Sequence, residues 1–202
     1  DAGKRSREDM RCFKVISWNV NGLRALLKKD TLVPFVERER PDVLLFNETK
    51  IDETVIPSVA DMLAPQGYKS HWATCTTKKG YSGVAAFTRV DPIRVQAGFG
   101  AGHDDEGRTL TLETKEMVIV AAYVPNSGMK LERLDYRTKE WDPAFAEYLQ
   151  RVSKAKPLLL CGDLNVAHLD VDVHDPKANK NKTPGFCDAE RENFGRLLDA
   201  GF

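Results

Sequence analysis

The stretch Pro157-Leu-Leu-Leu-Cys-Gly-Asp163-Leu-Asn165-Val-Ala-His168 decides how the rest of the chain is interpreted. Its run of four apolar residues, placed between a proline and a glycine, is typical of a strand buried on both faces. Asp163 and Asn165 follow the run, and in extended backbone their side chains leave the same face. A carboxylate beside an amide suits phosphate chemistry, in which water is deprotonated and a developing anion is held. A plain turn after a core strand stays open, because Gly, Asp and Asn are common in turns.

The composition excludes few classes of function. The chain has 202 residues, and 30 Lys and Arg balance 30 Asp and Glu. This length predicts one domain with a substantial core, and a net charge of zero means that any polyanion site must be a local patch. No apolar run reaches membrane-spanning length, so no membrane partner is expected. The four cysteines lack ligand or redox-motif spacing and are interpreted as reduced thiols of an intracellular protein: Cys12, Cys75, Cys161 and Cys187.

The pattern along the chain predicts an α/β domain in which helices sandwich the sheets. Residues 1–11 are charged and are expected to be a disordered tail. Helical periodicity predicts helices at 31–40, 52–64, 131–155 and 188–198, with Pro143 as a break within the third. Short apolar or β-branched runs predict strands at 13–18, 43–46, 68–72, 82–88, 93–97, 109–114, 117–124 and 158–161.

Four of these strands end in polar residues. In chain order the ends are Trp18-Asn19-Val-Asn21-Gly22-Leu-Arg24, Asn47-Glu48-Thr49-Lys50, Tyr123-Val-Pro-Asn126 and Gly162-Asp163-Leu-Asn165. Strand ends are where α/β domains place their sites. This ordered set, with Gly80-Tyr81-Ser82-Gly83 and Gly185-Phe186, resembles the exonuclease III type of apurinic/apyrimidinic endonuclease, eukaryotic-like, in the endonuclease, exonuclease and phosphatase superfamily. The resemblance runs from about Phe13 to Phe202 and implies a four-layered α/β sandwich of two packed mixed β-sheets flanked by helices.

The resemblance also implies a reaction, namely Mg²⁺-dependent hydrolysis of the DNA phosphodiester 5′ to an abasic site, with 3′–5′ exonuclease and 3′-phosphodiesterase side activities. Asp163 would deprotonate the water and Asn165 would hold the phosphate, with Asn19 orienting Asp163 or a phosphate oxygen. Tyr123 and Asn126 would contact the same phosphate, although a core aromatic remains the alternative for Tyr123.

The implied cofactor is Mg²⁺, with Mn²⁺ as a substitute. Glu48 would be its principal ligand, since Mg²⁺ prefers carboxylate oxygens and keeps several waters. Asn21 stands where many relatives have a metal-binding Asp and others have Asn. The neutral Asn side chain lowers the negative charge at the ion. The candidate metal ligands are Glu48, Asn21, Asp163 and Asn165.

The implied partner is duplex DNA that contains abasic sites. Contacts would come from loops beside the strand ends, including the basic loop 177–182, and would weaken with salt. Met129 stands where a relative has an Arg that wedges into the duplex. The alternating His and Asp of residues 168–174 are assigned to bracing that loop and not to a transition-metal site. The candidate DNA-binding residues are Arg24, Lys29, Lys79, Gly80, Tyr81, Arg108, Asn126, Asn179 and Lys180.

In the family that this chain resembles, the domain continues with strands that supply a second Asp, an aromatic pocket and a final Ser-Asp-His motif. Residues 12–202 are therefore expected to be the N-terminal part of a single domain. Activity is expected to need a separate C-terminal fragment, and the complete domain to be a monomer located in the nucleus, with the mitochondrion as the alternative. Two rival functions stay open: another metal-dependent phosphoesterase of the superfamily, and a non-catalytic protein that binds nucleic acid or protein.

Overall fold

Two four-stranded sheets form the centre of the molecule. The computed structural model describes residues 13–100 and 102–202, so the predicted tail at 1–11 lies outside the described residues. The first sheet, sheet A, has the order β1-β2-β4-β3, and sheet B has the order β5-β6-β7-β8. Each sheet is mixed, because β1 pairs with β2 and β7 with β8 in parallel while the other pairs are antiparallel. The strands are β1 (Val15–Asn19), β2 (Val43–Asn47), β3 (Lys69–Ala73), β4 (Val84–Thr88), β5 (Arg94–Ala97), β6 (Thr109–Glu113), β7 (Val118–Tyr123) and β8 (Leu158–Asp163).

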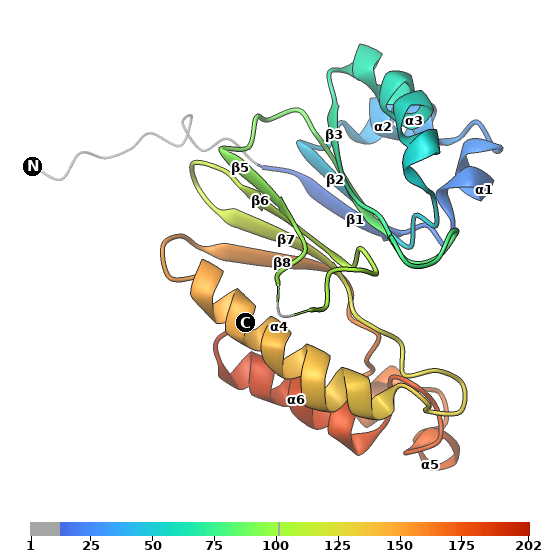
Figure 1. The fold of residues 1–202 in the computed structure, drawn as a ribbon, viewed down its shortest axis with the longest axis vertical. Helices are drawn as coiled ribbons and strands as arrows, with labels where there is room; N and C mark the ends of the chain where they lie inside the picture. The colour runs from blue at the N-terminus through green and yellow to red at the C-terminus, as the bar shows by residue number, and fades with distance from the viewer. Residues whose placement is uncertain (1–12, 101) are drawn as a thin grey trace, which may run out of the picture.

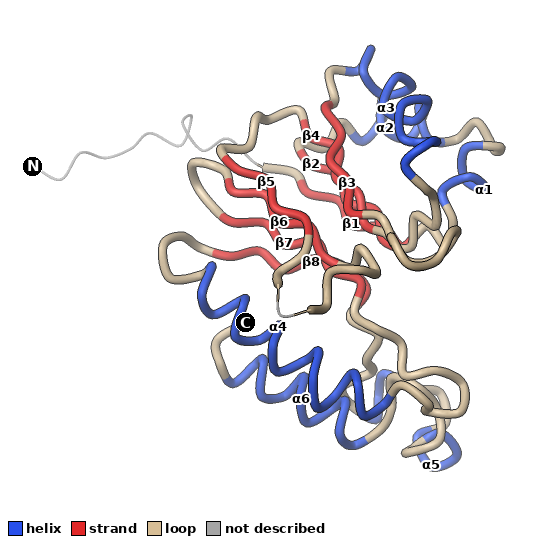
Figure 2. Tube along the Cα trace, in the orientation of Figure 1, coloured by secondary structure: helices blue, strands red, loops and turns tan. Residues whose placement is uncertain are grey.

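Helices cover the outer face of each sheet (Figure 1). Sheet A carries α1 (Leu23–Leu27), α2 (Leu32–Glu39) and α3 (Ile56–Leu63), and sheet B carries α4 (Asp142–Val152) and α6 (Asp188–Asp199). Shorter segments are the 3₁₀ turns η2 (Glu53–Val55), η3 (Ala64–Gln66) and η5 (Asp170–Asp172), the short helix α5 (Pro176–Asn179) and the π-helix η4 (Tyr136–Trp141). Among the residues described, no helix is long and apolar enough to cross a membrane. Figure 2 shows the same layers coloured by secondary structure.

Alternation along the strands produces the layers. Leu44 and Phe46 of β2 face the helices on sheet A, whereas Val43 and Leu45 of the same strand face sheet B. Successive side chains of a strand leave opposite faces, so one fully buried strand can serve two apolar layers. A third apolar layer lies between sheet B and α4, where Trp141 is completely buried. The four-layered α/β sandwich expected from the sequence is thereby confirmed.

The parallel pairs fix where a site can form. In the register of the sheets, Asn19 lies opposite Asn47 at the end of β1 and β2, and Tyr123 lies opposite Asp163 at the end of β7 and β8. The two sheets also contact each other through β1 and β8 and through β2 and β7. The carboxyl ends of four strands therefore meet at one edge of the sandwich, which is where the sequence places its polar residues.

Strand β8 departs from the expectation of a strand buried on both faces. None of its residues is fully buried in this structure, and Leu159 is 36% exposed. The reason is its place in the sheet: within residues 13–100 and 102–202, β8 is an edge strand that pairs with β7 alone. The apolar run predicted the strand correctly, and its burial wrongly.

The long helix expected at 131–155 is also different in detail. It consists of the π-helix η4 followed directly by α4, and Pro143 lies in the first turn of α4. Proline is tolerated at that position because the first amides of a helix have no intrahelical acceptor. The short helix α1 was not expected from the sequence.

Candidate active site

Asn19 joins the two sheets at the site. Its side-chain nitrogen donates to Glu48 Oε1 at 2.8 Å and to Asp163 Oδ2 at 2.8 Å. A primary amide has two N–H groups, so a single Asn19 side chain serves both carboxylates. Its own oxygen accepts from the backbone N–H of Asn21 at 2.9 Å, which fixes the orientation of the amide. Asn19 therefore holds one carboxylate from each sheet at a common centre.

The chain turns sharply after each of these strands. Glu48 has a φ of 53°, Asn21 of 45° and Asn165 of 48°, all in the left-handed region. Asn tolerates this region, whereas a Glu there carries a backbone cost on the order of 1 kcal/mol, which other contacts must offset. Asn165 is thus not in extended backbone as expected: its N–H bends back to Asp163 Oδ1 at 2.9 Å, and its side chain points elsewhere.

The side chains of Asn126 and Asn165 form a pair. Asn126 Nδ2 donates to Asn165 Oδ1 at 3.1 Å, and Asn165 Nδ2 donates to the carbonyl of Val124 at 2.8 Å. Gly128 N–H donates to Asn126 Oδ1 at 2.9 Å, which fixes the other end of the pair. Each amide carries a second N–H, and Asn126 is exposed. The pair can therefore donate hydrogen bonds to an anion at the edge of the site.

Tyr123 lies under the carboxylates and is 9% exposed. Burial, together with the negative charge of Glu48 and a hydrogen bond to it, raises the pKa of the Tyr123 hydroxyl far above its usual value, while Arg108 partly opposes this. The Arg108 guanidinium lies 4.7 Å from the centre of the Tyr123 ring and donates to the Tyr123 carbonyl at 3.1 Å. Tyr123 is thus held as a neutral hydroxyl that donates and does not ionise.

The side-chain oxygens of Glu48 and Asn21 both face the ammonium group of Lys50. Lys50 Nζ lies 2.9 Å from Glu48 Oε2 and 2.6 Å from Asn21 Oδ1. Burial would raise the pKa of Glu48, but hydrogen bonds from Asn19 and Lys50 outweigh it and leave that pKa below its usual value. In the part of the chain that the structure describes, no group of three or more His, Cys, Asp or Glu residues could hold a metal ion. A Mg²⁺ ion needs only one or two carboxylates, with waters and substrate phosphate as further ligands, so the pair of Glu48 and Asn21 is compatible with it.

Most of the candidate DNA-binding residues lie at the surface. Lys29, Lys79, Gly80 and Lys180 are exposed, and Tyr81 and Asn179 are half-buried. Two of the cations already have acidic neighbours, since Arg24 lies 3.3 Å from Asp52 and Lys180 lies 3.2 Å from Asp188.

Arg108 differs from the other candidate DNA-binding residues, because it is only 2% exposed. Its guanidinium donates to Glu106 at 2.6 Å and to the Tyr81 hydroxyl at 2.9 Å. The donors of Arg108 described here are used inside the protein, where they support Tyr81 and Tyr123, and its DNA contact stays a prediction from the sequence.

The structure adds residues that sequence reasoning missed. Lys50 stands in the quoted strand end, so the signal was present two residues after Glu48. Arg137 and Glu190, in contrast, are buried beside the site and come from η4 and α6. Their sequence separation is 53, which no local motif reveals.

Two packed mixed sheets, with carboxylates and amides gathered at the ends of their parallel strands, define an α/β sandwich with a polar site at one edge. Residues 16–200 match the sequence profile described as the endonuclease/exonuclease/phosphatase family. The chain belongs to this family, which confirms the resemblance found in the sequence.

The matching relatives and solved structures include proteins named exodeoxyribonuclease, DNA repair nuclease and AP endonuclease. The chain is 44% identical to the exodeoxyribonuclease of Bacillus subtilis, covering 94% of this chain and 73% of that protein. It is 48% identical to the Danio rerio protein named DNA repair nuclease APEX1, covering 94% of this chain and 60% of that protein. Among solved structures, an AP endonuclease from Archaeoglobus fulgidus superposes with a TM-score of 0.81 at 27% identity, covering 95% of this chain and 72% of that one. The chain thus spans between three fifths and three quarters of these relatives.

Proposed function

We propose that this chain carries the catalytic centre of a DNA base-excision repair endonuclease that hydrolyses the phosphodiester 5′ to abasic sites in duplex DNA. The observation that carries the proposal is the bridge that Asn19 makes between Glu48 and Asp163, at 2.8 Å to each. The printed names of the relatives, exodeoxyribonuclease and DNA repair nuclease, support the same substrate class.

The residues divide the chemistry among them. Asp163, oriented by donors on both oxygens, accepts the proton of the attacking water. Asn126 and Asn165 direct amide N–H groups at the phosphate, and the neutral Tyr123 hydroxyl donates a hydrogen bond to developing negative charge. Asn19 holds the base in place. The products are a 3′-hydroxyl and a 5′-deoxyribose phosphate.

The proposed cofactor is Mg²⁺, with Mn²⁺ as a substitute. Glu48 and Asn21 would hold it, because both already face the Lys50 ammonium. When bound, a divalent cation stabilises negative charge on the phosphate oxygens. The Asn19 amide lies between Glu48 and Asp163. We assign Asp163 to the attacking water and Asn165 to the phosphate.

The proposed partner is duplex DNA, bound by the exposed residues Lys29, Lys79, Gly80 and Lys180 beside the strand ends. We further propose that a C-terminal segment completes the site, in agreement with the greater length of the relatives, and that the complete domain acts as a monomer in the nucleus, or alternatively in the mitochondrion.

The test is cleavage of a duplex with one tetrahydrofuran abasic analogue by the full-length protein, with Mg²⁺ and with EDTA. The expected result is metal-dependent incision 5′ to the analogue, lost in Glu48→Gln. A Lys50→Met variant should need less Mg²⁺ for half-maximal activity, because the ammonium no longer competes at Glu48. Absence of incision by folded full-length protein would contradict the proposal.

A second candidate is removal of 3′-terminal phosphate groups from DNA. It is favoured by the structural match to a Neisseria 3′ phosphatase solved with product DNA, which has a TM-score of 0.82 and 27% identity. A duplex with a 3′-phosphate at a nick, run beside the abasic duplex, compares the two reactions. The ratio of the two rates decides which reaction is the principal one.

A further inference from the structure

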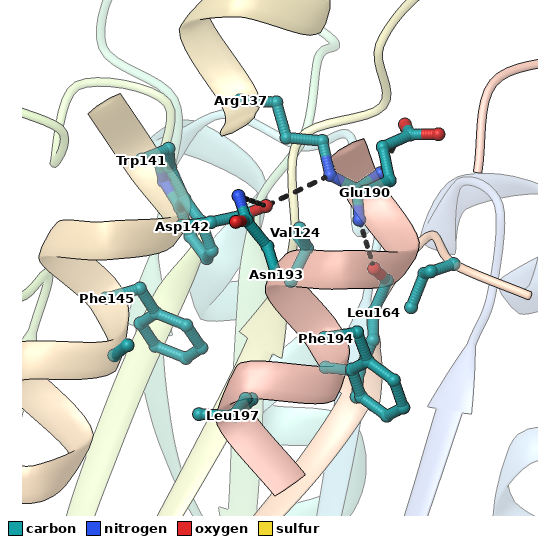
Figure 3. Close-up of a pocket in the computed structure, with 12 residues that line it drawn as sticks. Val124, Arg137, Trp141, Asp142, Phe145, Leu164, Glu190, Asn193, Phe194 and Leu197 are labelled. Carbon is teal, nitrogen blue, oxygen red and sulfur yellow. Dashed lines mark hydrogen bonds and ion pairs between the residues drawn. The ribbon is translucent and has the colours of Figure 1, made fainter. Parts of the chain in front are cut away.

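The π-helix η4 places the buried side chain of Arg137 behind the backbone of the candidate active site. In η4 the N–H of Asp142 bonds to the carbonyl of Arg137, five residues earlier, which is the π-helical spacing. This wider turn buries Arg137, Thr138 and Trp141 on one side. Figure 3 shows the Arg137 side chain running from the helix toward Leu164, in the small cavity between η4, α4 and α6. A π-helical turn is rare, and such turns are common at functional sites.

The Arg137 guanidinium holds the segment that follows Asp163. Its Nη2 donates to the carbonyl of Leu164 at 2.9 Å, and its Nη1 donates to the carbonyl of Asn165 at 2.6 Å. The rigid fork of a guanidinium fixes two neighbouring carbonyls in one geometry. The left-handed turn at Asn165 is therefore held from the protein interior.

Glu190 connects the same arginine to the other half of the amide pair. Its side chain is completely buried, and Oε1 accepts from Arg137 Nη1 at 3.0 Å. The same oxygen accepts a short hydrogen bond from the hydroxyl of Ser127, the residue next to Asn126. Its other oxygen accepts from the N–H of Cys187 at 2.9 Å, at the start of α6. Ser127, Arg137 and Glu190 thus form one buried chain of hydrogen bonds that links Asn126 to Asn165.

We infer that Arg137 and Glu190 are positioning residues that set the separation of the Asn126 and Asn165 side chains. The inference rests on the proposed function, in which these two amides hold the phosphate. Neither Arg137 nor Glu190 reaches the site itself, since both lie behind its backbone. Misplacement of a phosphate-binding group by about 1 Å lowers the rate about 100-fold, whereas contacts to the rest of the DNA are unaffected.

The first arm of the test is kinetic, with Arg137→Lys and Glu190→Gln in the full-length protein. Lysine keeps the charge but cannot hold both carbonyls and Glu190, so kcat for the abasic duplex should fall by about 10- to 100-fold while KM changes less than about threefold. In an Asn165→Ala background the same substitutions should lower kcat less than about twofold, because the amide pair whose separation they set is already broken. Equal losses in both backgrounds would overturn the inference.

The matched control is Thr111→Val. It removes another buried hydrogen bond of the same half of the molecule, between Thr111 of β6 and the Tyr148 hydroxyl of α4 at 2.5 Å, which lies outside the chain of hydrogen bonds that links Asn126 to Asn165. It should lower the melting temperature and leave kcat at the wild-type value. If Thr111→Val lowers kcat as much as Arg137→Lys at equal loss of stability, the role of Arg137 is packing alone and the inference fails.

The second arm does not depend on the substrate. Hydrogen–deuterium exchange of segments 124–128 and 164–168 should be faster in Glu190→Gln than in Thr111→Val, when both are compared with the wild type below their melting temperatures. Unchanged exchange in these segments would overturn the inference even if the protein cleaves abasic DNA. Failure of the wild type to cleave would count against the proposed function alone, since this second arm would still decide the role of Glu190.

Discussion

Asp163 is the residue for which chemistry and geometry agree most directly. Asn19 Nδ2 donates to one of its oxygens at 2.8 Å, and the N–H of Asn165 donates to the other at 2.9 Å. These donors come from both sheets, so the carboxylate has a fixed orientation and still has lone pairs available for water. A change of this residue should affect proton transfer much more than binding.

The first prediction follows from this geometry. Asp163→Asn has the same shape but cannot take up a proton, so kcat for abasic duplex should fall by about 100- to 10,000-fold. Affinity for the same duplex in EDTA should stay within about threefold. Single-turnover cleavage gives the rate and fluorescence anisotropy gives the affinity. A variant that keeps a tenth of the wild-type rate would exclude Asp163 as the base.

The second prediction concerns Glu48 and pH. Burial would raise its pKa from the ordinary 4.5, but hydrogen bonds from Asn19 and Lys50 leave it lowered in the folded protein. When the pKa of a carboxyl group is lower in the folded protein than in the unfolded protein, its ionised form stabilises the fold at pH values above the unfolded-state pKa. This contribution is lost as the pH falls through the folded-state pKa. The wild type should therefore lose stability below pH 4.5 more steeply than Glu48→Gln.

The measurement is urea unfolding in EDTA from pH 7 to pH 3, compared as the difference in free energy of unfolding between wild type and variant. Glu37→Gln, which removes one carboxylate at an exposed helix position, is the matched control. A Glu48→Gln curve parallel to that of the wild type over the whole range would contradict the lowered pKa.

Much of the site could be read at the level of single residues, because Asn19, Glu48, Asp163 and Asn165 follow apolar runs directly in the sequence. What could not be read was the backbone at the turn. Asn165 adopts a φ of 48°, so its side chain leaves Asp163 and pairs with Asn126. A two-residue spacing predicts a shared face only if the strand continues, and here the strand ends at Asp163.

At the scale of elements, the close approach of β7 and β8 is controlled by one glycine. Gly162 has a φ of 146°, and a Cβ at this position would lie 1.9 Å from the carbonyl oxygen of Ala122. Backbone atoms of a central strand cannot move aside cheaply. Gly162 therefore allows β8 to end beside β7 with Asp163 opposite Tyr123.

The third prediction compares two glycines. Gly162→Ala should destabilise the fold by about 3 kcal/mol through overpacking and backbone strain. Gly195→Ala lies inside α6, where the nearest atom to the new Cβ is His168 Nε2 at 3.6 Å, and should stabilise the fold by about 0.5–1 kcal/mol. Urea unfolding of both variants checks the pair. Equal effects of the two substitutions would contradict the close approach described here.

Element types were predictable where the apolar pattern was clear. The helix expected at 31–40 corresponds to α2, because its apolar positions repeat with the helical period, and the strand expected at 43–46 corresponds to β2, because a short continuous apolar run is typical of a buried strand. The burial of β8 was not predictable from Leu158, Leu159 and Leu160, since an apolar run does not tell which strands lie beside it. The π-helix η4 differs from an α-helix by one residue in the spacing of its hydrogen bonds, and periodicity over six residues does not resolve that difference.

At the scale of the whole molecule, 30 basic residues balance 30 acidic residues. The formal net charge is zero. Lys29, Lys79 and Lys180 are nevertheless exposed, on the segments that follow α1, β3 and α5. Because salt screens charges over about 10 Å at 0.1 M, a DNA backbone at this edge responds to the local cations more than to the net charge.

The fourth prediction is that binding to duplex DNA weakens with salt through these local cations. Lys79 is exposed in the loop between β3 and β4, and Lys115 is exposed in the turn between β6 and β7, at the opposite end of the strands. Loss of one phosphate contact lowers the slope of log affinity against log salt by about 1. Lys79→Ala should show this change and Lys115→Ala should not, although both alter the net charge equally. Anisotropy titrations from 50 to about 200 mM salt measure the slopes. Equal slopes for the two variants would mean that the bound DNA responds to net charge and that the edge at the strand ends does not hold its backbone.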